Sequence, residues 1–161
     1  MDARRESEPS PMKRVTVERK SERELVVTRT FHAPPRLVFE AWSRPELFKQ
    51  WWLPKSMGMT LRSIEMDVRT GGRYRLGFGD GIDFFGRYLE VTPPSRIVWT
   101  NEESGDAGPV TTVTFEAKDG KTLLVMSELY PSKEALDAAG TGAADAMGET
   151  FQQLDELLTR S

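Results

Sequence analysis

The feature that most constrains the fold is a long stretch, residues 59–130, in which apolar and polar side chains alternate with a period of two. Successive side chains of a β-strand point to opposite faces of a sheet, so this period predicts strands with one buried face. Turn residues divide the stretch at positions 71–72, 79–81, 92–95 and 119–120, and a polar loop covers positions 101–109. We therefore expect six consecutive strands in an antiparallel meander.

A seventh strand is predicted over residues 25–31, where β-branched side chains dominate. The preceding residues 14–23 either extend this strand or remain loose. Pro34 and Pro35 end the strand, and the helical spacing of Leu37, Val38, Ala41 and Trp42 predicts a short helix after it. Pro45 ends that helix and opens a second one, whose apolar stripe is Leu47, Phe48, Trp51 and Trp52.

The C-terminal segment has a helical period instead. Ser132 is placed to cap a short helix over residues 133–138, and glycines at 140 and 142 interrupt the pattern. Apolar residues then recur three and four positions apart, at Ala143, Ala144, Met147, Phe151, Leu154, Leu157 and Leu158. This spacing predicts one long amphipathic helix.

These elements predict an α+β domain of the helix-grip kind, in which a curved antiparallel sheet of six or seven strands wraps around the long C-terminal helix. Two short helices follow the first strand and close one end. Such a sheet curls as it twists, and a cavity tends to remain between it and the helix. We assign residues 14–161 to this single domain and expect residues 1–13, which are almost devoid of apolar side chains, to form a disordered or loosely ordered tail.

Composition excludes several kinds of chemistry. The chain has no cysteine, so disulfides and thiolate zinc sites cannot form, and its single histidine, His32, cannot build a multi-histidine metal site. We therefore expect no metal and no cofactor. The net charge of −3 opposes phosphate binding, so no nucleic-acid partner is expected. No apolar run reaches the roughly 20 residues that span a membrane, and the polar N-terminus lacks a signal-peptide core, so we expect a cytoplasmic protein.

Several segments, in order along the chain, match the motifs of a known superfamily. They are APPRLVFEAW at 33–42, PEL at 45–47, QWWLP at 50–54, DVRTGG at 67–72, GRYLEV at 86–91, PPSRIVW at 93–99, GKTLLVMSE at 120–128 and MGETFQQLDEL at 147–157. This pattern resembles the SRPBCC superfamily (START-like, birch-pollen-allergen-like), in the branch similar to the activator of heat-shock-protein-90 ATPase. The resemblance covers about residues 24–158 and implies the helix-grip fold.

The resemblance is less specific for function. Relatives are lipid carriers, hormone- and allergen-type ligand binders, polyketide cyclases and chaperone regulators, and a shared fold does not decide among them. Two departures from the family pattern stand out. The tryptophan pair is followed by Leu53-Pro54 where Gly-Pro is frequent, and Glu128 stands near a position where the family often carries a histidine.

Aromatic and methionine side chains are the richest candidate site. We expect a ligand-binding cavity lined by Trp42, Trp52, Met66, Phe78, Phe84, Tyr88, Trp99, Met126, Glu128, Met147 and Phe151. The alternative for each of these residues is ordinary core packing, because aromatic side chains bury large apolar areas and methionine fills irregular gaps. Trp51 and Trp52 are adjacent, so one of them should pack inward while the other lies at the cavity rim or an interface.

Charged residues on the strands raise further candidates. Glu128 shares strand parity with Leu124 and Met126, so it could face the concave side as a polar anchor or a general acid or base, together with Tyr88. The alternative for Glu128 is a salt-bridged or solvated residue at the end of the sheet. The arginines at 73, 75 and 87 alternate with apolar residues, which favours a solvated convex face.

The leading functional hypothesis is the binding of a small hydrophobic or amphipathic molecule between the C-terminal helix and the sheet. A second hypothesis is a chaperone-associated interaction module that uses exposed apolar residues such as Trp51 or Trp52 and the loop at 101–109. A third is a cyclase or hydratase that uses Glu128 or Tyr88, although no constellation of residues compels catalysis. A homodimer through a sheet edge or exposed tryptophans is compatible with such a domain.

Overall fold

The computed structural model of the chain describes residues 15–58, 61–78, 83–103, 105, 108–140 and 142–160. The tail predicted over residues 1–13 and the turn predicted at 79–81 lie outside this part. The side chains of Ala143 and Ala144 and all of Met59 lie outside it as well.

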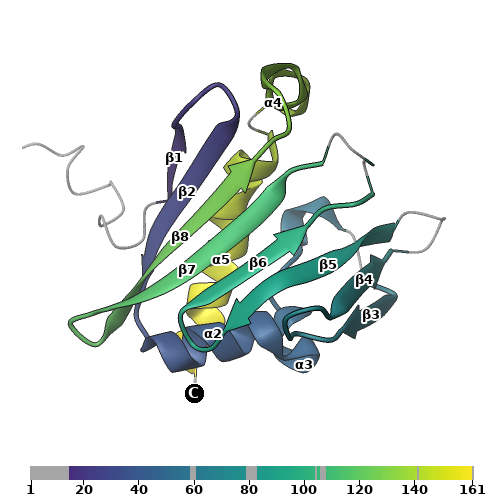
Figure 1. Cartoon of the computed structure of the whole chain (residues 1–161). Helices are drawn as coiled ribbons and strands as arrows, with labels where there is room; N and C mark the ends of the chain where they lie inside the picture. Colours follow the sequence, from purple (N-terminus) through teal and green to yellow (C-terminus); the bar gives the residue numbers. More distant parts are fainter. Residues whose placement is uncertain are drawn as a thin grey trace, which may run out of the picture.

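Eight strands of the described chain form one antiparallel sheet, in the order β1-β2-β8-β7-β6-β5-β4-β3 (Figure 1). Their bounds are β1 Thr16–Arg19, β2 Glu24–Phe31, β3 Ser63–Met66, β4 Arg73–Gly77, β5 Asp83–Thr92, β6 Arg96–Thr100, β7 Val110–Lys118 and β8 Lys121–Leu129. The predicted six-strand meander is β3 to β8, and the strand predicted over residues 25–31 lies within β2. Both predictions are confirmed.

The strand β1 raises the count above the six or seven that the sequence predicted. The main chain turns back after β1, where the amide of Lys20 donates to the carbonyl oxygen of Glu24 at 2.9 Å. Val17 then lies opposite Val27 in antiparallel register. Of the segment 14–23, the described residues 15–23 therefore neither lengthen the first strand nor remain loose, because they form a hairpin with it.

Two short helices follow β2, as predicted: α2 (Pro35–Ser43) and α3 (Pro45–Phe48). A proline stands at the first position of each, where its missing N–H would have no acceptor within the helix. α3 ends at Phe48, so Trp51 and Trp52 lie in the turn beyond it and not in the helical stripe that the spacing predicted. The 3-10 turn η1 (Lys55–Met57) completes this segment.

Two further helices end the described chain. α4 (Lys133–Ala139) is capped by Ser132, whose hydroxyl oxygen accepts from the amide of Ala135 at 3.1 Å. α5 (Gly142–Arg160) is the long C-terminal helix that the sequence predicted. Figure 1 shows α5 lying along one face of the sheet, behind β7 and β8, with α2 and α3 at the lower end. This arrangement is the helix-grip fold.

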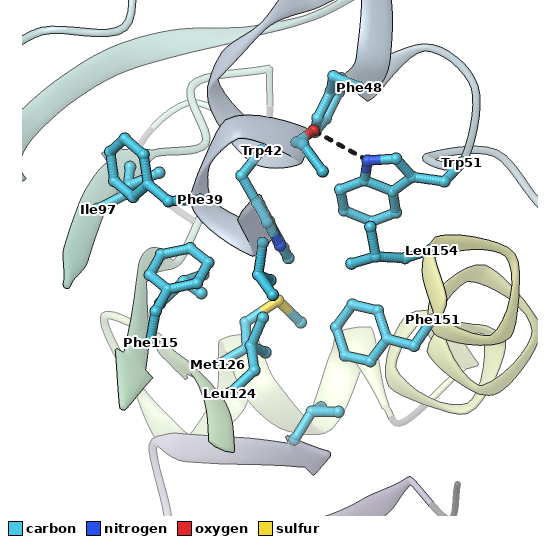
Figure 2. Close-up of a cluster of buried hydrophobic side chains, with 14 of the residues drawn as sticks. Phe39, Trp42, Phe48, Trp51, Ile97, Phe115, Leu124, Met126, Phe151 and Leu154 are labelled. Atoms are coloured by element: carbon cyan, nitrogen blue, oxygen red, sulfur yellow. Dashed lines mark hydrogen bonds between the residues drawn. The ribbon is translucent and has the colours of Figure 1, made fainter. Parts of the chain in front are cut away.

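The core fills the space between α5 and the sheet. Strand β8 buries Thr122, Leu124 and Met126, and α5 contributes Phe151 and Leu154, which are fully buried. Figure 2 shows Phe151 and Leu154 facing Met126, with Trp42 of α2 alongside. These large side chains occupy the middle of the space between α5 and the sheet.

Candidate ligand-binding site

A small cavity lies beside this core, between the α2–α3 pair and strands β3 to β6. Its volume is about 50 Å³. Its wall is mostly aromatic and consists of Trp42, Phe48, Trp52, Met66, Tyr74, Leu76, Phe84, Tyr88, Ile97, Trp99 and Asn101. A water molecule needs roughly 10–15 Å³ measured in this way, whereas small-molecule sites commonly span about 300–1,000 Å³. The cavity as it stands therefore admits only molecules of solvent size.

Six of the eleven predicted cavity residues line this space: Trp42, Trp52, Met66, Phe84, Tyr88 and Trp99. The other five do not. Met126 and Phe151 are buried in the packed core, and Met147 is half-buried against it. Phe78 is buried with its ring edge-on to Phe84 at 5.1 Å, and Glu128 lies on the far strand β8.

The position of the cavity differs from the one predicted. No described side chain of α5 lines it, because Phe151 and Leu154 fill the space between α5 and the sheet. The ring of Phe151 packs edge-on against Phe31 at 5.5 Å and against Trp42 at 6.2 Å. The remaining empty space is displaced toward the α2–α3 pair.

The sequence analysis did not predict five of the residues that line the cavity: Phe48, Tyr74, Leu76, Ile97 and Asn101. The strand period could have found three of them, since Tyr74 and Leu76 share parity with Phe78, and Ile97 shares parity with Trp99. Asn101 follows β6 in a loop, where no period applies. Only the tertiary structure brings it to the cavity.

Trp42 lies at the centre of the aromatic wall. Its ring centroid is 4.8 Å from that of Trp51, 5.9 Å from Trp52 and 5.8 Å from Trp99. The side chain is buried, and its indole Nε1 has no hydrogen-bond partner among the described residues. A buried N–H without an acceptor costs about 1–3 kcal/mol.

The two adjacent tryptophans separate as predicted. Trp51 is fully buried in the core, whereas Trp52 is half-buried and lines the cavity. The Trp52 ring stacks on Phe48 at 4.8 Å with an interplanar angle of 26°. Trp52 and Phe48 together form the wall of the cavity on the α3 side.

Helix α5 holds the turn that carries these tryptophans. The Gln153 amide nitrogen donates to the carbonyl oxygens of Trp51 at 3.0 Å and Leu53 at 2.8 Å, and its oxygen accepts from the amide of Lys55 at 2.9 Å. Glu149 accepts from the amide of Ser56 at 3.0 Å and from its hydroxyl, and these bonds lower the pKa of the Glu149 carboxyl. The Trp52 side of the cavity is thus fixed to α5.

The polar groups of the cavity belong to Tyr74, Tyr88 and Asn101. The Tyr74 hydroxyl donates to the carbonyl oxygen of Thr100 at 2.7 Å. The Asn101 amide nitrogen donates to the carbonyl oxygen of Pro109 and to the Thr111 hydroxyl, both at 2.9 Å. Because both amide hydrogens of Asn101 are engaged, only its side-chain oxygen remains to meet a ligand, as an acceptor.

The hydroxyl groups of the two tyrosines in the cavity cannot act as bases near neutral pH. Burial raises the pKa of Tyr88, and the nearby Asp67 raises it further. Burial is also the main reason why the pKa of Tyr74 is raised, with Glu103 adding to the effect. Both phenols therefore stay protonated near neutral pH and can only donate or accept hydrogen bonds.

Glu128 shares the concave face with Leu124 and Met126, as its strand parity predicted. It lies opposite Leu25 on β2 and Thr111 on β7. Burial raises the pKa of the Glu128 carboxyl, and a hydrogen bond with Thr111 partly opposes this shift. Since Glu128 does not line the cavity and Tyr88 does, the structure does not bring the two predicted acid–base candidates into one site.

The arginines at 73, 75 and 87 are exposed, as predicted for a solvated face. Arg75 pairs with Asp83 and Arg87 with Glu102, each at 2.7 Å. Within the described residues, no group of three or more histidine, aspartate or glutamate side chains could hold a metal ion. None of the described helices has the length and apolar character that crossing a membrane requires.

The sheet wrapped around α5, with an aromatic cavity beside it, defines a protein of the helix-grip class. The sequence profile of the family described as activator of Hsp90 ATPase homolog 1-like protein matches residues 32–159, and the chain belongs to this family, within the SRPBCC superfamily. None of the curated proteins matches the chain significantly.

Solved structures share this architecture. A Rhodobacter sphaeroides protein is 25% identical, with a TM-score of 0.80 over 91% of this chain and 99% of that one. A Staphylococcus epidermidis protein is 27% identical, with a TM-score of 0.72 over 90% and 94% of the two chains. A Mycobacterium smegmatis protein, Ms6760, is 24% identical, with a TM-score of 0.76 over 92% and 99%, and supports the fold alone.

Proposed function

We propose that this protein binds a small apolar or amphipathic molecule in the aromatic cavity beside α2 and α3. The observation that carries the proposal is the composition of the wall. Three of the four tryptophans of the chain line it, and its polar groups are few. Apolar surface that a ligand buries there contributes about 25 cal/mol per Å².

A ligand larger than a few water molecules requires a wall side chain to move. Phe84 is the lining residue best suited to do so, because 41% of it is already exposed while its cross-strand neighbour Leu76 is buried. Turning Phe84 outward exposes less additional apolar area than moving one of the buried lining residues would. We therefore take Phe84 as the residue that admits the ligand.

Tryptophan fluorescence tests the proposal directly, because Trp42, Trp52 and Trp99 surround the site. The protein is titrated with a panel of alkyl, aromatic and polyketide-like probes. At least one probe should change the emission saturably, and Phe84→Ala should alter its dissociation constant by about tenfold, the scale of one well-placed contact residue. Leu89→Ala is the matched control, because Leu89 is an equally exposed apolar residue of β5 that does not line the cavity.

If packed side chains leave no room for a ligand in the cavity, the titrations and the two variants should give a different result. If no probe changes the emission saturably, or if Phe84→Ala and Leu89→Ala act alike, the cavity is a packing defect of the core and the proposal fails.

The family description favours a second candidate function, the stimulation of a chaperone ATPase. Trp51 cannot contribute to such an interface as it stands, because it is fully buried, but the partly exposed Trp52 could. The ATPase rate of an Hsp90-type chaperone, measured with and without the protein, tests this function. A rate that does not change, together with no complex on gel filtration, would exclude it.

A further inference from the structure

We infer that the ligand is an alkyl carboxylate whose negative charge is bound in an open groove between the α3 turn and strand β3. This inference rests on the proposed function, because the groove lies on the same face of the sheet as the aromatic cavity. It adds the chemical class of the ligand and a second set of binding residues.

The groove has a volume of about 520 Å³, within the usual range of small-molecule sites, in contrast to the cavity itself. It is lined by Lys49, Gln50, Leu53, Lys55, Leu61, Arg62, Ser63 and Ile64. The apolar members, Leu53, Leu61 and Ile64, are half-buried, and the cationic residues are exposed. The groove therefore offers an aliphatic floor and a charged rim.

All charged residues that line the groove are positively charged. Lys49, Lys55 and Arg62 line the groove, and no acidic residue does, although the chain as a whole carries a net charge of −3. Two carboxylates near the groove, those of Glu46 and Glu149, are held by other donors. Arg44 binds Glu46 at 2.7 Å, and the amide of Ser56 binds Glu149 at 3.0 Å. An anion in the groove would thus meet three positive charges without a competing carboxylate in the lining.

The groove and the cavity share one face of the sheet. Ile64, in the groove, lies directly opposite Leu76, in the cavity wall, and Met66 follows two residues later on the same strand face. On the α3 side, Trp52 of the cavity is followed by Leu53 of the groove. The groove and the cavity are therefore neighbours along β3 and along the α3 turn, and a ligand whose charge lies at the rim of the groove can extend its alkyl chain along the shared sheet face toward the cavity.

The occupant follows from these contacts. The leucine and isoleucine floor fits an alkyl chain, and the guanidinium of Arg62 can bind a carboxylate through two parallel hydrogen bonds. Two other surface hollows lack this combination. One contains Glu65 and Asp67 beside a single arginine, and in the other the arginines Arg75 and Arg87 already have acidic partners.

Three twelve-carbon probes of equal length test the inference: laurate, dodecanol and dodecylammonium. We expect laurate to bind about tenfold more tightly than dodecanol, and dodecylammonium more weakly than either, as measured by tryptophan fluorescence and calorimetry below micelle-forming concentrations. Raising the ionic strength from about 0.01 M to about 1 M shortens the screening length from about 30 Å to about 3 Å and should remove the preference for laurate.

The variant Lys55→Glu/Arg62→Glu should abolish the preference for laurate over dodecanol, measured as the ratio of the two dissociation constants in the same variant. Its matched control is Lys118→Glu/Lys121→Glu, in the β7–β8 hairpin, which changes the net charge equally at a surface outside the groove. The control should bind laurate within about twofold of the unaltered protein. All four substituted side chains lie on the surface or are only half-buried, and thermal unfolding verifies that both variants fold.

The outcomes separate the two proposals. If dodecanol and laurate bind equally, or if the groove variant keeps the preference for laurate, the anion inference fails while the proposed function stands. If none of the three alkyl probes binds but another apolar probe does, the inference fails as well. If no probe of any kind binds, both proposals fail.

Discussion

The indole nitrogen of Trp51 donates a hydrogen bond to the carbonyl oxygen of Ala41 at 2.9 Å, inside the core (Figure 2). Ala41 lies in the last turn of α2, where carbonyl groups lack a partner within the helix. The amide four residues later would belong to Pro45, which has none. Trp51 therefore satisfies a carbonyl group that the α2–α3 junction leaves open, and this bond explains why Trp51 and not Trp52 is the inward tryptophan.

Trp51→Phe should lower the free energy of unfolding by about 1–3 kcal/mol beyond the loss of ring area, because the Ala41 carbonyl group is then buried without a partner. Urea denaturation followed by circular dichroism measures this effect. Trp52→Phe makes the same change of ring at a half-buried position and should cost less. Equal losses in the two variants would contradict the role of the hydrogen bond.

The Glu128 carboxyl should make stability depend on pH in a defined direction. Burial raises its pKa above the unfolded value of about 4.3, so its favourable contribution is present below that value and is lost as the pH rises through the folded pKa. Glu128→Gln, which cannot ionise, should match the unaltered protein near pH 4 and exceed it in stability at about pH 8. Urea denaturation across this range measures the difference.

Glu102 provides a control of opposite sign. Hydrogen bonds from the Thr100 hydroxyl at 2.6 Å and from Arg87 lower the pKa of its carboxyl, so its contribution is present at neutral pH and is lost on acidification. Glu102→Gln should be less stable than the unaltered protein near pH 7, and the gap should close toward pH 3. A Glu128→Gln gain that does not change with pH would show that burial of the charge is not its cause.

Arg29 and Asp155 form a buried ion pair, so the effects of substituting the two residues on stability should depend strongly on each other. Arg29 on β2 is fully buried, and Asp155 on α5 lies 3.5 Å away. Burial lowers the pKa of Arg29, and the negative charge of Asp155 counters this effect. Asp155→Asn should cost about 3–5 kcal/mol, the usual result of removing one partner of a buried pair. The loss of stability is measured by urea denaturation.

The double variant Arg29→Met/Asp155→Asn tests the coupling. Because it removes the buried positive charge as well, its loss should be smaller than the sum of the two single losses by at least about 1 kcal/mol. Strict additivity would mean that the two residues contribute independently.

Local patterns predicted most of the fold. The period of two over residues 59–130 anticipated strands β3 to β8, and the spacing from Met147 to Leu158 anticipated α5. The hairpin of β1 was not anticipated, because Thr16–Arg19 is short and polar and gains its place only by pairing with β2. The end of α3 was also missed, since Trp51 and Trp52 fit a helical stripe equally well.

The site was predicted only in part. Trp42, Tyr88 and Trp99 were chosen because large aromatic residues were expected near the space between the sheet and the helix, either as cavity lining or as core, and the structure places all three in the cavity wall. Whether an inner residue meets a neighbour or an empty space depends on side-chain volumes across the interior, and no local pattern contains that information. Phe151 and Met126 shared the pattern but lie in the packed core.

The sequence by itself determined that the chain forms a sheet wrapped around a C-terminal helix, because strand and helix periods are local properties of neighbouring residues. It also determined that the interior is aromatic. Only the tertiary structure decided where the interior remains open, beside α2 and α3 and not under α5. The physical reason is that Phe151 and Leu154 fill the space between α5 and the sheet, whereas Trp51, bound to the Ala41 carbonyl group, holds the α3 turn against the core and leaves Trp52 in the cavity wall.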